Sequence, residues 1–333
     1  MGRMRWNQPT LLQALPVAFA LWACGAPASG GGDHTRSDPA TEADPRYPTL
    51  GPPRAEGWRT RVDERGQSFD AYRESRPNPP VPSRRTLYLQ PLGPYPREPV
   101  LPGDLPALQL EEEGYVSFVF SPTPTRLAEF VSAFYGLPAS VLPEIALVDV
   151  APEPVRIHNH HAQFDARSLL AALGSGLPPD GYSMTALVAR DLVVDAEQEY
   201  AFGYGLHVDR LALASFVQLD PLFIGEDRSA EFQVRIRERS YKLLAHEVGH
   251  TLGMEHCDRY ECVMNGVAHL SELDATPLHL CPICMRKLVW LVEVDQEARY
   301  RELAAHYAEV GLTRALDWVE ARDRVEAVPA GSN

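Results

Sequence analysis

The sequence predicts an α+β domain in which helices pack over one sheet. Candidate strands and short helices alternate between Arg84 and Leu219, and a long helix is expected from about Ser229 to Gly253. Helical periodicity returns after Cys284. Hydrophobic residues make up 45% of the 333 residues, which is enough for one sizeable core.

The expected strands are short runs of aliphatic, aromatic and β-branched residues. Their ranges are Thr86–Gln90, Tyr115–Phe120, Glu144–Val150, Met184–Ala189, Tyr200–Gly205 and Leu211–Leu219.

The expected helices carry start and stop signals. Thr123 and Pro124 read as an N-cap and first-turn pair before Leu127, Phe130, Val131 and Phe134. Asp165 is expected to cap a short helix that ends at Gly174, and Gly311 separates helices over Val294–Val310 and Thr313–Val325.

The N-terminus predicts a processing segment. Arg3 and Arg5 precede an apolar run over Thr10–Ala23, which is too short for a transmembrane helix and is interrupted by a proline. The run ends at Ala23-Cys24, which looks like a bacterial lipobox, so residues 1–23 are expected to be removed and Cys24 lipidated. An ordinary signal peptide with an incidental cysteine is the alternative. In the favoured interpretation the protein is exported and membrane-anchored in a bacterial cell envelope, touching the membrane only through its lipid.

Residues 24–82 are rich in proline and glycine, and we expect a flexible tether there. The folded domain is then expected over residues 83–328. Trp58, Phe69 and Tyr72 are the tether residues that could pack on the edge of this domain.

A histidine motif points to a catalytic metal. In His246-Glu247-x-x-His250 the two imidazoles lie one helical turn apart, so both can reach one ion. Gly253 is a natural helix end, after which the chain can return with His256 as a third ligand. Three imidazoles plus a water describe a catalytic zinc site rather than a closed structural one.

A cysteine pattern overlaps this motif. Cys257, Cys262, Cys281 and Cys284 have the spacing C-x4-C…C-x2-C, which suits a structural zinc held by four thiolates. Two disulfides are the alternative in an exported protein. We favour two zinc ions per chain, one on the histidines and one on the cysteines.

Together these residues resemble the archaemetzincins, a family of zinc peptidases in the metzincin clan. The resemblance rests on HEVGHTLGMEHC, on Cys262-Val263-Met264 and on Cys281-Pro-Ile-Cys284. It implies a metzincin-like domain with a mixed sheet, an active-site helix and a zinc-binding segment of four cysteines. It also implies that Met264 forms the Met-turn, a hydrophobic floor below the zinc ligands.

The expected activity is hydrolysis of peptide bonds by a zinc-activated water, with Glu247 as general base and acid. The resemblance places Phe202, Gly203 and Gly205 in an edge strand that binds an extended peptide substrate, although an ordinary hairpin strand is equally consistent. A catalytically weak, zinc-containing peptide-binding module of the same fold is the alternative function, and zinc-dependent hydrolysis of another kind of bond stays open.

Two further features argue against a nucleic-acid partner and against a third metal site. The net charge of −14 argues against nucleic acid, which calls for a basic patch. His158, His160 and His161 are close in sequence but lack acidic or thiol companions at ligand spacing, so we expect a solvated loop rather than a third metal site.

Overall fold

The computed structural model describes residues 47–97, 105–112, 115–151, 153–195 and 199–326. The predicted signal segment, Cys24 and residues 25–46 lie outside this part of the chain.

The central sheet has the strand order β10-β11-β8-β1-β4, with β5 also beside β1. Its strands are β1 (Thr86–Gly93), β4 (Ala139–Val141), β5 (Ile145–Ala146), β8 (Gly181–Val188), β10 (Gly203–Leu206) and β11 (Leu211–Ser215). All neighbouring pairs are parallel except β10 and β11, which are antiparallel. The sheet is therefore mixed, as expected, and β10 is its antiparallel edge strand.

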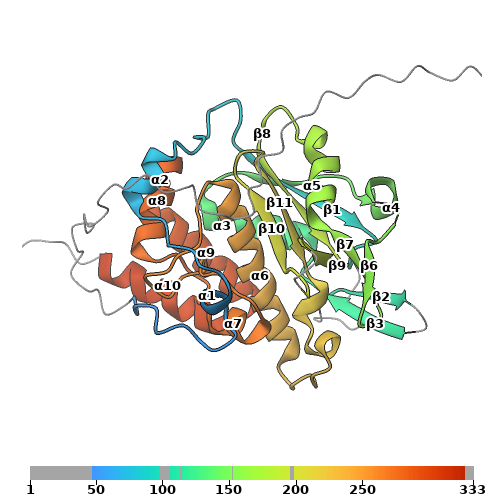
Figure 1. The fold of residues 1–333 in the computed structure, drawn as a ribbon. Coiled ribbons are helices and arrows are strands. Elements are labelled where there is room, and N and C mark those ends of the chain that lie inside the picture. The colour runs from blue at the N-terminus through green and yellow to red at the C-terminus, as the bar shows by residue number, and fades with distance from the viewer. Residues whose placement is uncertain (1–46, 98–104, 113–114, 152, 196–198, 327–333) are drawn as a thin grey trace, which may run out of the picture. The chain divides into compact units, whose positions relative to one another are not determined.

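Helices cover both faces of this sheet (Figure 1). Helices α3 (Pro124–Tyr135) and α6 (Phe232–Thr251) pack on one face, and α5 (Ala166–Leu173) packs on the other. Strand β8 shows the consequence: Met184, Ala186 and Val188 join the core around α5, while Leu187 joins the larger core around α3 and α6. Every residue of β8 is buried, as is typical of a strand covered on both sides.

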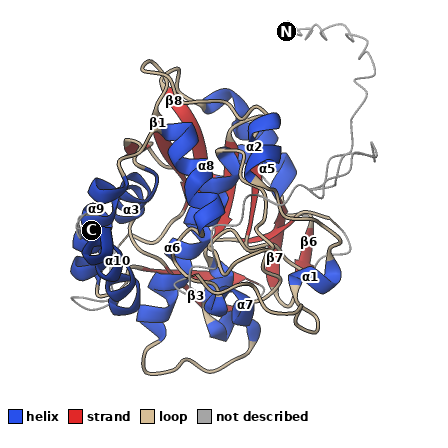
Figure 2. Ribbon diagram, turned by 90° about the vertical axis from the view of Figure 1, so that its left-hand side faces the viewer, coloured by secondary structure: helices blue, strands red, loops and turns tan. Residues whose placement is uncertain are grey.

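The C-terminal third is helical, with α7 (Leu270–Ala275), α8 (Pro282–Val292), α9 (Gln296–Val310) and α10 (Thr313–Glu326). Figure 2 shows α9 and α10 together at the left, beside α3, and α8 in the middle of the view. Gly311, with φ of 72°, separates α9 from α10 at the predicted position.

The predicted helix ends are confirmed. Thr123 Oγ1 accepts a hydrogen bond from the Arg126 N–H at the start of α3, and the Asp165 carboxylate accepts one from Ser168 at the start of α5. Helix α6 ends just before Gly253, whose φ of 80° is the left-handed conformation that glycine adopts cheaply.

Three of the expected strands are shorter in the structure than the sequence predicted. The run Glu144–Val150 pairs with β1 only over Ile145–Ala146, and Leu147–Val150 then forms the short helix α4. The run Leu211–Leu219 is a strand only to Ser215, because Val217–Leu219 turns into a 3-10 helix. Strand β10 begins at Gly203 rather than Tyr200.

The structure contains two smaller sheets, and of their strands only Tyr115–Phe120 was expected from the sequence. They are the hairpin of β2 (Ala107–Glu112) with β3 (Tyr115–Phe120), and the sheet of β6 (Arg156–His158), β7 (His161–Asp165) and β9 (Asp191–Val193). The histidine cluster is therefore a hairpin and not a solvated loop. His161 is buried, with its ring stacked on Phe223 at 3.8 Å between centroids.

The prediction of a flexible tether is wrong for residues 47–82. This segment contains helices α1 (Trp58–Arg61) and α2 (Phe69–Glu74), and Phe69 and Tyr72 are buried in the domain. Tyr72 Oη donates a hydrogen bond of 2.7 Å to the Leu252 carbonyl. The composition suggested a tether because its prolines and glycines disfavour long elements, but they do not prevent packing against an existing domain.

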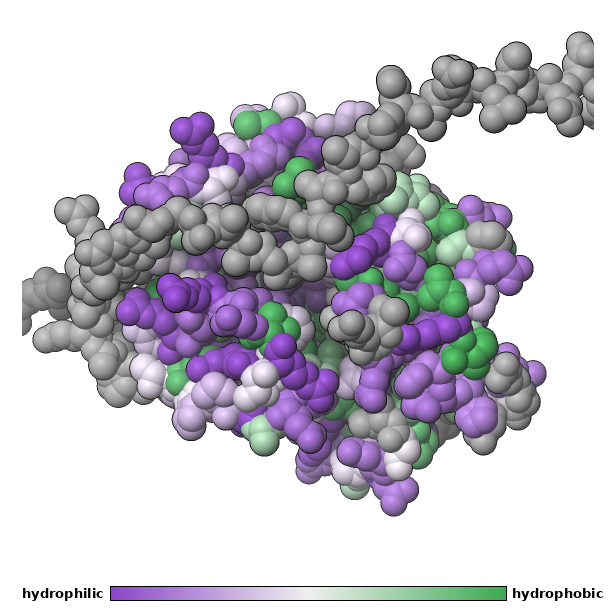
Figure 3. Space-filling model, in the orientation of Figure 1, coloured by the Kyte–Doolittle hydropathy of each residue, from purple (hydrophilic) through white to green (hydrophobic). Residues whose placement is uncertain are grey.

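The described surface is mostly hydrophilic in the view of Figure 3, with hydrophobic residues in small scattered patches. Such scattering is ordinary for a globular domain. Among the described residues, no helix has the length and apolar character needed to cross a membrane.

Candidate metal centre and active site

Three imidazoles converge at the C-terminal end of α6. His246 and His250 come from the last two turns of this helix, and His256 comes from the loop that follows Gly253. Nε2 of His246 lies 3.0 Å from Nε2 of His250 and 3.2 Å from Nε2 of His256. The structure thus brings together the three predicted ligands.

Each ring is oriented through its other nitrogen. Nδ1 of His246 lies 2.9 Å from the Val263 carbonyl oxygen, and Nδ1 of His250 lies 2.7 Å from that of Met254. Nδ1 of His256 lies 2.6 Å from Oε1 of Glu64. Because a carbonyl or carboxylate oxygen only accepts, each Nδ1 carries the proton and each Nε2 presents a lone pair.

This donor set fits zinc. Tetrahedral zinc with Zn–N bonds of about 2.0–2.1 Å separates its nitrogen ligands by about 3.3 Å, close to the spacings found here. Three lone pairs directed at one another repel unless a cation lies between them, so the arrangement is that of a metal site.

Burial keeps two of the ligands in the form that binds a metal. It lowers the pKa of His246 to about 3, and neighbouring His256 adds to the shift. Burial also lowers the pKa of His250 well below its usual range. Both rings are therefore neutral at pH 7, as metal binding requires.

Glu247 belongs to α6, and its side chain lies against the edge strand β10. Its side chain is buried, its Oε2 has no hydrogen-bond partner among the described residues, and burial raises its pKa well above the usual value. A Cβ on Gly203 would collide with this carboxylate, and a Cβ on Gly205 would stand 2.7 Å from Cβ of His250. The glycines of β10 therefore allow the strand to approach the site closely.

Phe202, the third residue placed in the substrate strand, has a different position. It precedes β10, and its side chain is buried in the main core, edge-on to Tyr200 at 5.3 Å between ring centroids. Its carbonyl accepts a hydrogen bond from the Ser215 N–H. The side chain of Phe202 is therefore part of the core.

Met264 lies against the helix that carries the ligands. It is fully buried, and a Cβ on Gly249 would collide with its sulfur and stand 2.9 Å from its Cε. The methionine thus packs against α6 between the two histidines of the motif.

The four cysteines form a second cluster. Cys257, Cys262, Cys281 and Cys284 are buried and free, with all four sulfur atoms within 4.8 Å of one another. Sγ of Cys257 lies 3.7 Å from Sγ of Cys281, far from the 2.05 Å of a disulfide and close to the spacing of about 3.8 Å for thiolates on tetrahedral zinc.

Backbone N–H groups point at these sulfurs. Met264 and Cys281 donate to Sγ of Cys262 at 3.5 and 3.3 Å, and Cys284 donates to Sγ of Cys281 at 3.5 Å. Hydrogen bonds from the neighbouring cysteine side chains lower the pKa of Cys257 well below its usual value. Burial raises the pKa of Cys262, and the side-chain hydrogen bond with Cys257 raises that of Cys284. Four converging sulfurs suit a metal ion, whose binding displaces the thiol protons.

Two buried or partly buried polar residues of the site escaped the sequence analysis. Asn265 holds the loop between the first two cysteines: its side chain accepts from the Cys262 N–H and donates to the carbonyls of Cys257 and Tyr260. Glu64 reaches His256 from a distant part of the chain. Asn265 could have been found as a polar residue next to Met264, but no spacing rule links Glu64 to His256.

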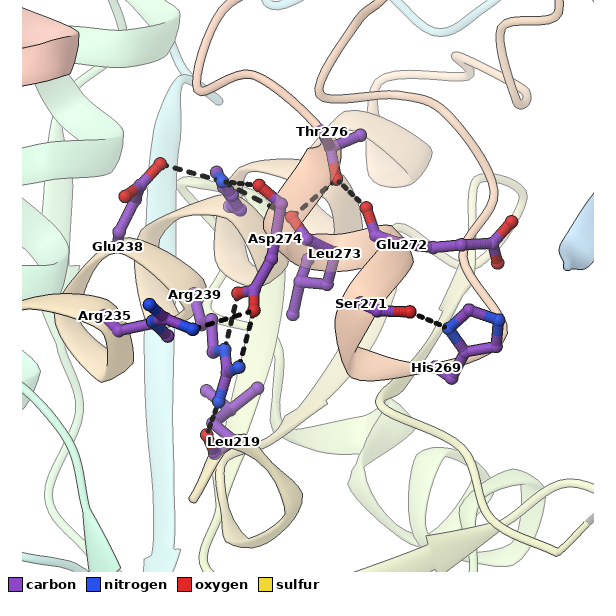
Figure 4. Close-up of polar contacts among 11 residues, drawn as sticks. Leu219, Arg235, Glu238, Arg239, His269, Ser271, Glu272, Leu273, Asp274 and Thr276 are labelled. Carbon is purple, nitrogen blue, oxygen red and sulfur yellow. Dashed lines mark hydrogen bonds and ion pairs between the residues drawn. The ribbon is translucent and has the colours of Figure 1, made fainter. Parts of the chain in front are cut away.

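A polar brace joins α6 to α7, which follows the metal-binding loop (Figure 4). Arg239, 4% exposed, forms a bidentate ion pair with Asp274: its Nε and Nη2 each donate a hydrogen bond of 2.7 Å to one carboxylate oxygen. The nitrogen of Lys242 donates to the carbonyls of Leu273 and Asp274. These contacts hold the middle of α6 against the C-terminal part of α7.

Comparison with known proteins identifies relatives of this chain. The profile of peptidase family M54 matches residues 139–289. Archaemetzincin-2 of Homo sapiens is 27% identical over 275 residues, which cover 74% of this chain and 70% of that protein. Archaemetzincin of Thermococcus kodakarensis is 27% identical over 171 residues, which cover 50% of this chain and 89% of that protein.

Solved structures of archaemetzincins are similar to parts of the chain. The protein from Methanopyrus kandleri is 26% identical with a TM-score of 0.45, covering 65% of this chain and 99% of its own. The protein from Archaeoglobus fulgidus, complexed with malonate, is 22% identical with a TM-score of 0.41, covering 61% of this chain and 99% of its own.

Proposed function

The chain belongs to peptidase family M54, the archaemetzincins, and we propose that this zinc metallopeptidase uses Glu247 as its general base and acid. One observation carries the proposal. The Glu247 carboxylate is buried on the helix that carries His246 and His250, against the glycines of β10, with one oxygen that no described residue satisfies. A buried carboxylate oxygen without a partner is costly unless another group uses it.

Zinc bound by the three histidines would supply Lewis-acid chemistry, activating a water and polarising the substrate carbonyl. Glu247 follows His246 directly in the sequence and is not one of the three residues that would hold the metal. In the proposed reaction its carboxylate removes a proton from the attacking water and delivers it to the leaving amine. The pKa of Glu247, raised by burial, suits a group that must both accept and release a proton.

We propose that the substrate binds along β10. This strand is the edge of the sheet beside Glu247, and an extended peptide can add to such an edge through backbone hydrogen bonds. Gly203 and Gly205 leave the approach to the site free of side chains. Phe202 is not part of the proposed substrate edge, because its side chain lies in the core and its carbonyl is bonded to Ser215.

We also propose two zinc ions per chain. The spacing of the cysteine sulfurs and their N–H donors support a structural ion on Cys257, Cys262, Cys281 and Cys284. A structural zinc provides on the order of 10–16 kcal/mol of apparent binding free energy near neutral pH, which favours occupied thiolates over disulfides.

The test of the mechanism is a pair of substitutions. Glu247→Gln is expected to keep zinc and lose hydrolysis of a peptide library, because the amide cannot take the proton. His250→Ala is expected to lose the zinc of the histidine site as well. Near-wild-type hydrolysis by Glu247→Gln would refute the role of Glu247. Failure of the wild-type chain to cleave any library member would favour the peptide-binding module instead.

For the N-terminus we propose export, cleavage before Cys24 and lipidation of that cysteine. The apolar run followed by Ala23-Cys24 supports this, and both residues lie outside the described part of the structure. Mass spectrometry of the mature N-terminus tests it. A mature chain that begins at another residue, or that retains Met1, would refute the lipid anchor without affecting the peptidase.

A further inference from the structure

Residues 48–72, here called the strap, run along the loop that carries the third zinc ligand. Their contacts follow one another in order from Glu261 back to Leu252. Pro48 and Leu50 pair with the backbone of Glu261 and Arg259, Thr49 bridges to Tyr260, Gln67 contacts the backbone of Glu255 and Gly253, and Tyr72 bonds to Leu252.

We infer that the strap positions the third zinc ligand, and that Glu64 is the residue through which it acts on His256. The inference rests on the proposed role of His256 as a ligand. The other two ligands take their Nδ1 acceptors, Val263 and Met254, from the metal-binding loop itself. His256 alone among the three takes its acceptor from the strap.

The geometry around Glu64 is specific. Its Oε1 lies 2.6 Å from Nδ1 of His256 and also accepts a hydrogen bond from the indole nitrogen of Trp58. The Trp58 ring packs edge-on against the His256 ring at 4.9 Å between centroids. His256 is thus held by a hydrogen bond in the plane of its ring and by an aromatic contact beside it.

His256 needs this support because of its place in the chain. His246 and His250 stand on a continuous helix, whereas residues 252–268 contain no helix or strand longer than an isolated bridge. A ligand on such a loop keeps its orientation only through the contacts of its own side chain and of the backbone beside it. The strap supplies both kinds of contact.

Two helices hold the part of the strap that contains Glu64, one at Trp58 and one at Gln67. The Glu272 carboxylate of α7 accepts a hydrogen bond of 3.0 Å from the Trp58 backbone N–H. Lys287 of α8, 1% exposed, donates to the carbonyl and the side chain of Gln67 at 2.7 and 2.8 Å. Helix α8 also carries Cys284, so one helix contacts both the strap and the cysteine cluster.

The strap lies outside residues 139–289, the part that the family profile matches. The profile region therefore contains all three histidines but not the acceptor that orients His256. A complete metal site in this chain depends on a segment nearly two hundred residues before the ligand.

The test compares Glu64→Ala, Glu64→Gln and the matched control Asp63→Asn in the full chain, since Asp63 is the exposed neighbour of Glu64. Zinc affinity is measured by chelator competition, and the Co²⁺-loaded protein is followed by absorption spectroscopy. Thiolate-to-cobalt bands report the cysteine site, whereas ligand-field bands are read for the histidine site.

Removing the acceptor in Glu64→Ala is expected to weaken zinc at the histidine site by about 10–100-fold and to alter its cobalt ligand-field spectrum. Glu64→Gln keeps an acceptor oxygen and is expected to recover most of the affinity, while Asp63→Asn behaves as wild type. If Glu64 only stabilised the fold, its substitutions would lower the thermal stability of the protein, and Glu64→Gln would not recover zinc affinity relative to Glu64→Ala.

Unchanged zinc affinity and cobalt spectrum in Glu64→Ala would overturn the inference, and so would equal losses in Glu64→Ala and Glu64→Gln. Because these measurements need no substrate, they separate the inference from the proposed function. A chain that depends on Glu64 for zinc but cleaves no peptide would refute the peptidase mechanism alone.

Discussion

The approach of β10 to Glu247 leads to a prediction for Gly203→Ala. The added methyl group would be wedged between the Glu247 carboxylate and the Leu213 carbonyl oxygen, from which it would stand only 2.6 Å. Ordinary contact begins at 3.4 Å, so a shift of 3.4 − 2.6 = 0.8 Å is required. The Leu213 carbonyl belongs to β11 inside the sheet, so β10 or the Glu247 side chain must yield.

A displacement of this size has a predictable kinetic cost. Misplacing a reacting group by about 1 Å costs on the order of 100-fold in rate, equivalent to about 2.7 kcal/mol of transition-state stabilisation. We therefore expect kcat/KM of Gly203→Ala to fall by about two orders of magnitude. The histidines are not displaced by this methyl group, so zinc content should stay at the wild-type level.

The assay is the hydrolysis of the best peptide from a library, measured well below the unfolding temperature together with zinc content. Gly174→Ala is the matched control, because its new methyl group would meet only Cδ1 of Leu211, at 3.8 Å, and its φ of −55° suits alanine. A kcat/KM for Gly203→Ala within threefold of wild type would refute the argument that β10 needs glycine to approach Glu247.

The remaining predictions concern the cysteine cluster and the brace between α6 and α7. Cys281→Ser is expected to release the structural metal and to lower peptidase activity, because Cys257 adjoins His256; retention of full activity and metal would contradict this. Metal analysis with thiol counting on denatured protein, leaving Cys24 aside, should find two zinc ions and four free thiols, whereas one zinc and no thiols would mean disulfides. Asp274→Ala leaves buried Arg239 without its carboxylate and should reduce the free energy of unfolding by about 3 kcal/mol in denaturant titrations. The double substitution Arg239→Met with Asp274→Leu should recover most of that loss, and no recovery would show that the Arg239 charge is not the cause.

Local sequence was a good guide where the structure depends on neighbouring residues. The capping positions Thr123 and Asp165 and the stop at Gly253 were predictable because a cap hydrogen bond or a left-handed glycine involves only three or four residues. The clustering of the three histidines and of the four cysteines was predictable for a related reason, since candidate metal ligands within one short stretch follow the spacing that an ion's geometry allows.

Strand ends were less predictable because they depend on partners. The runs Glu144–Val150 and Leu211–Leu219 are apolar throughout, yet each remains a strand only while a neighbour offers hydrogen bonds. Once β1 or β8 no longer pairs with it, the chain turns into α4 or a 3-10 helix. Apolar character alone does not distinguish a buried strand from a buried turn of helix.

The sequence by itself indicated the resemblance to archaemetzincins, the histidines and cysteines that the structure brings together, and the order of the main elements, since all of these reside in local patterns. Only the tertiary structure decided that residues 47–82 pack on the domain, and that Glu64 orients His256. The physical reason is that a contact between residues far apart in the chain has no sequence periodicity. It forms because the fold places a carboxylate oxygen and an imidazole nitrogen 2.6 Å apart, and that placement depends on every element between them.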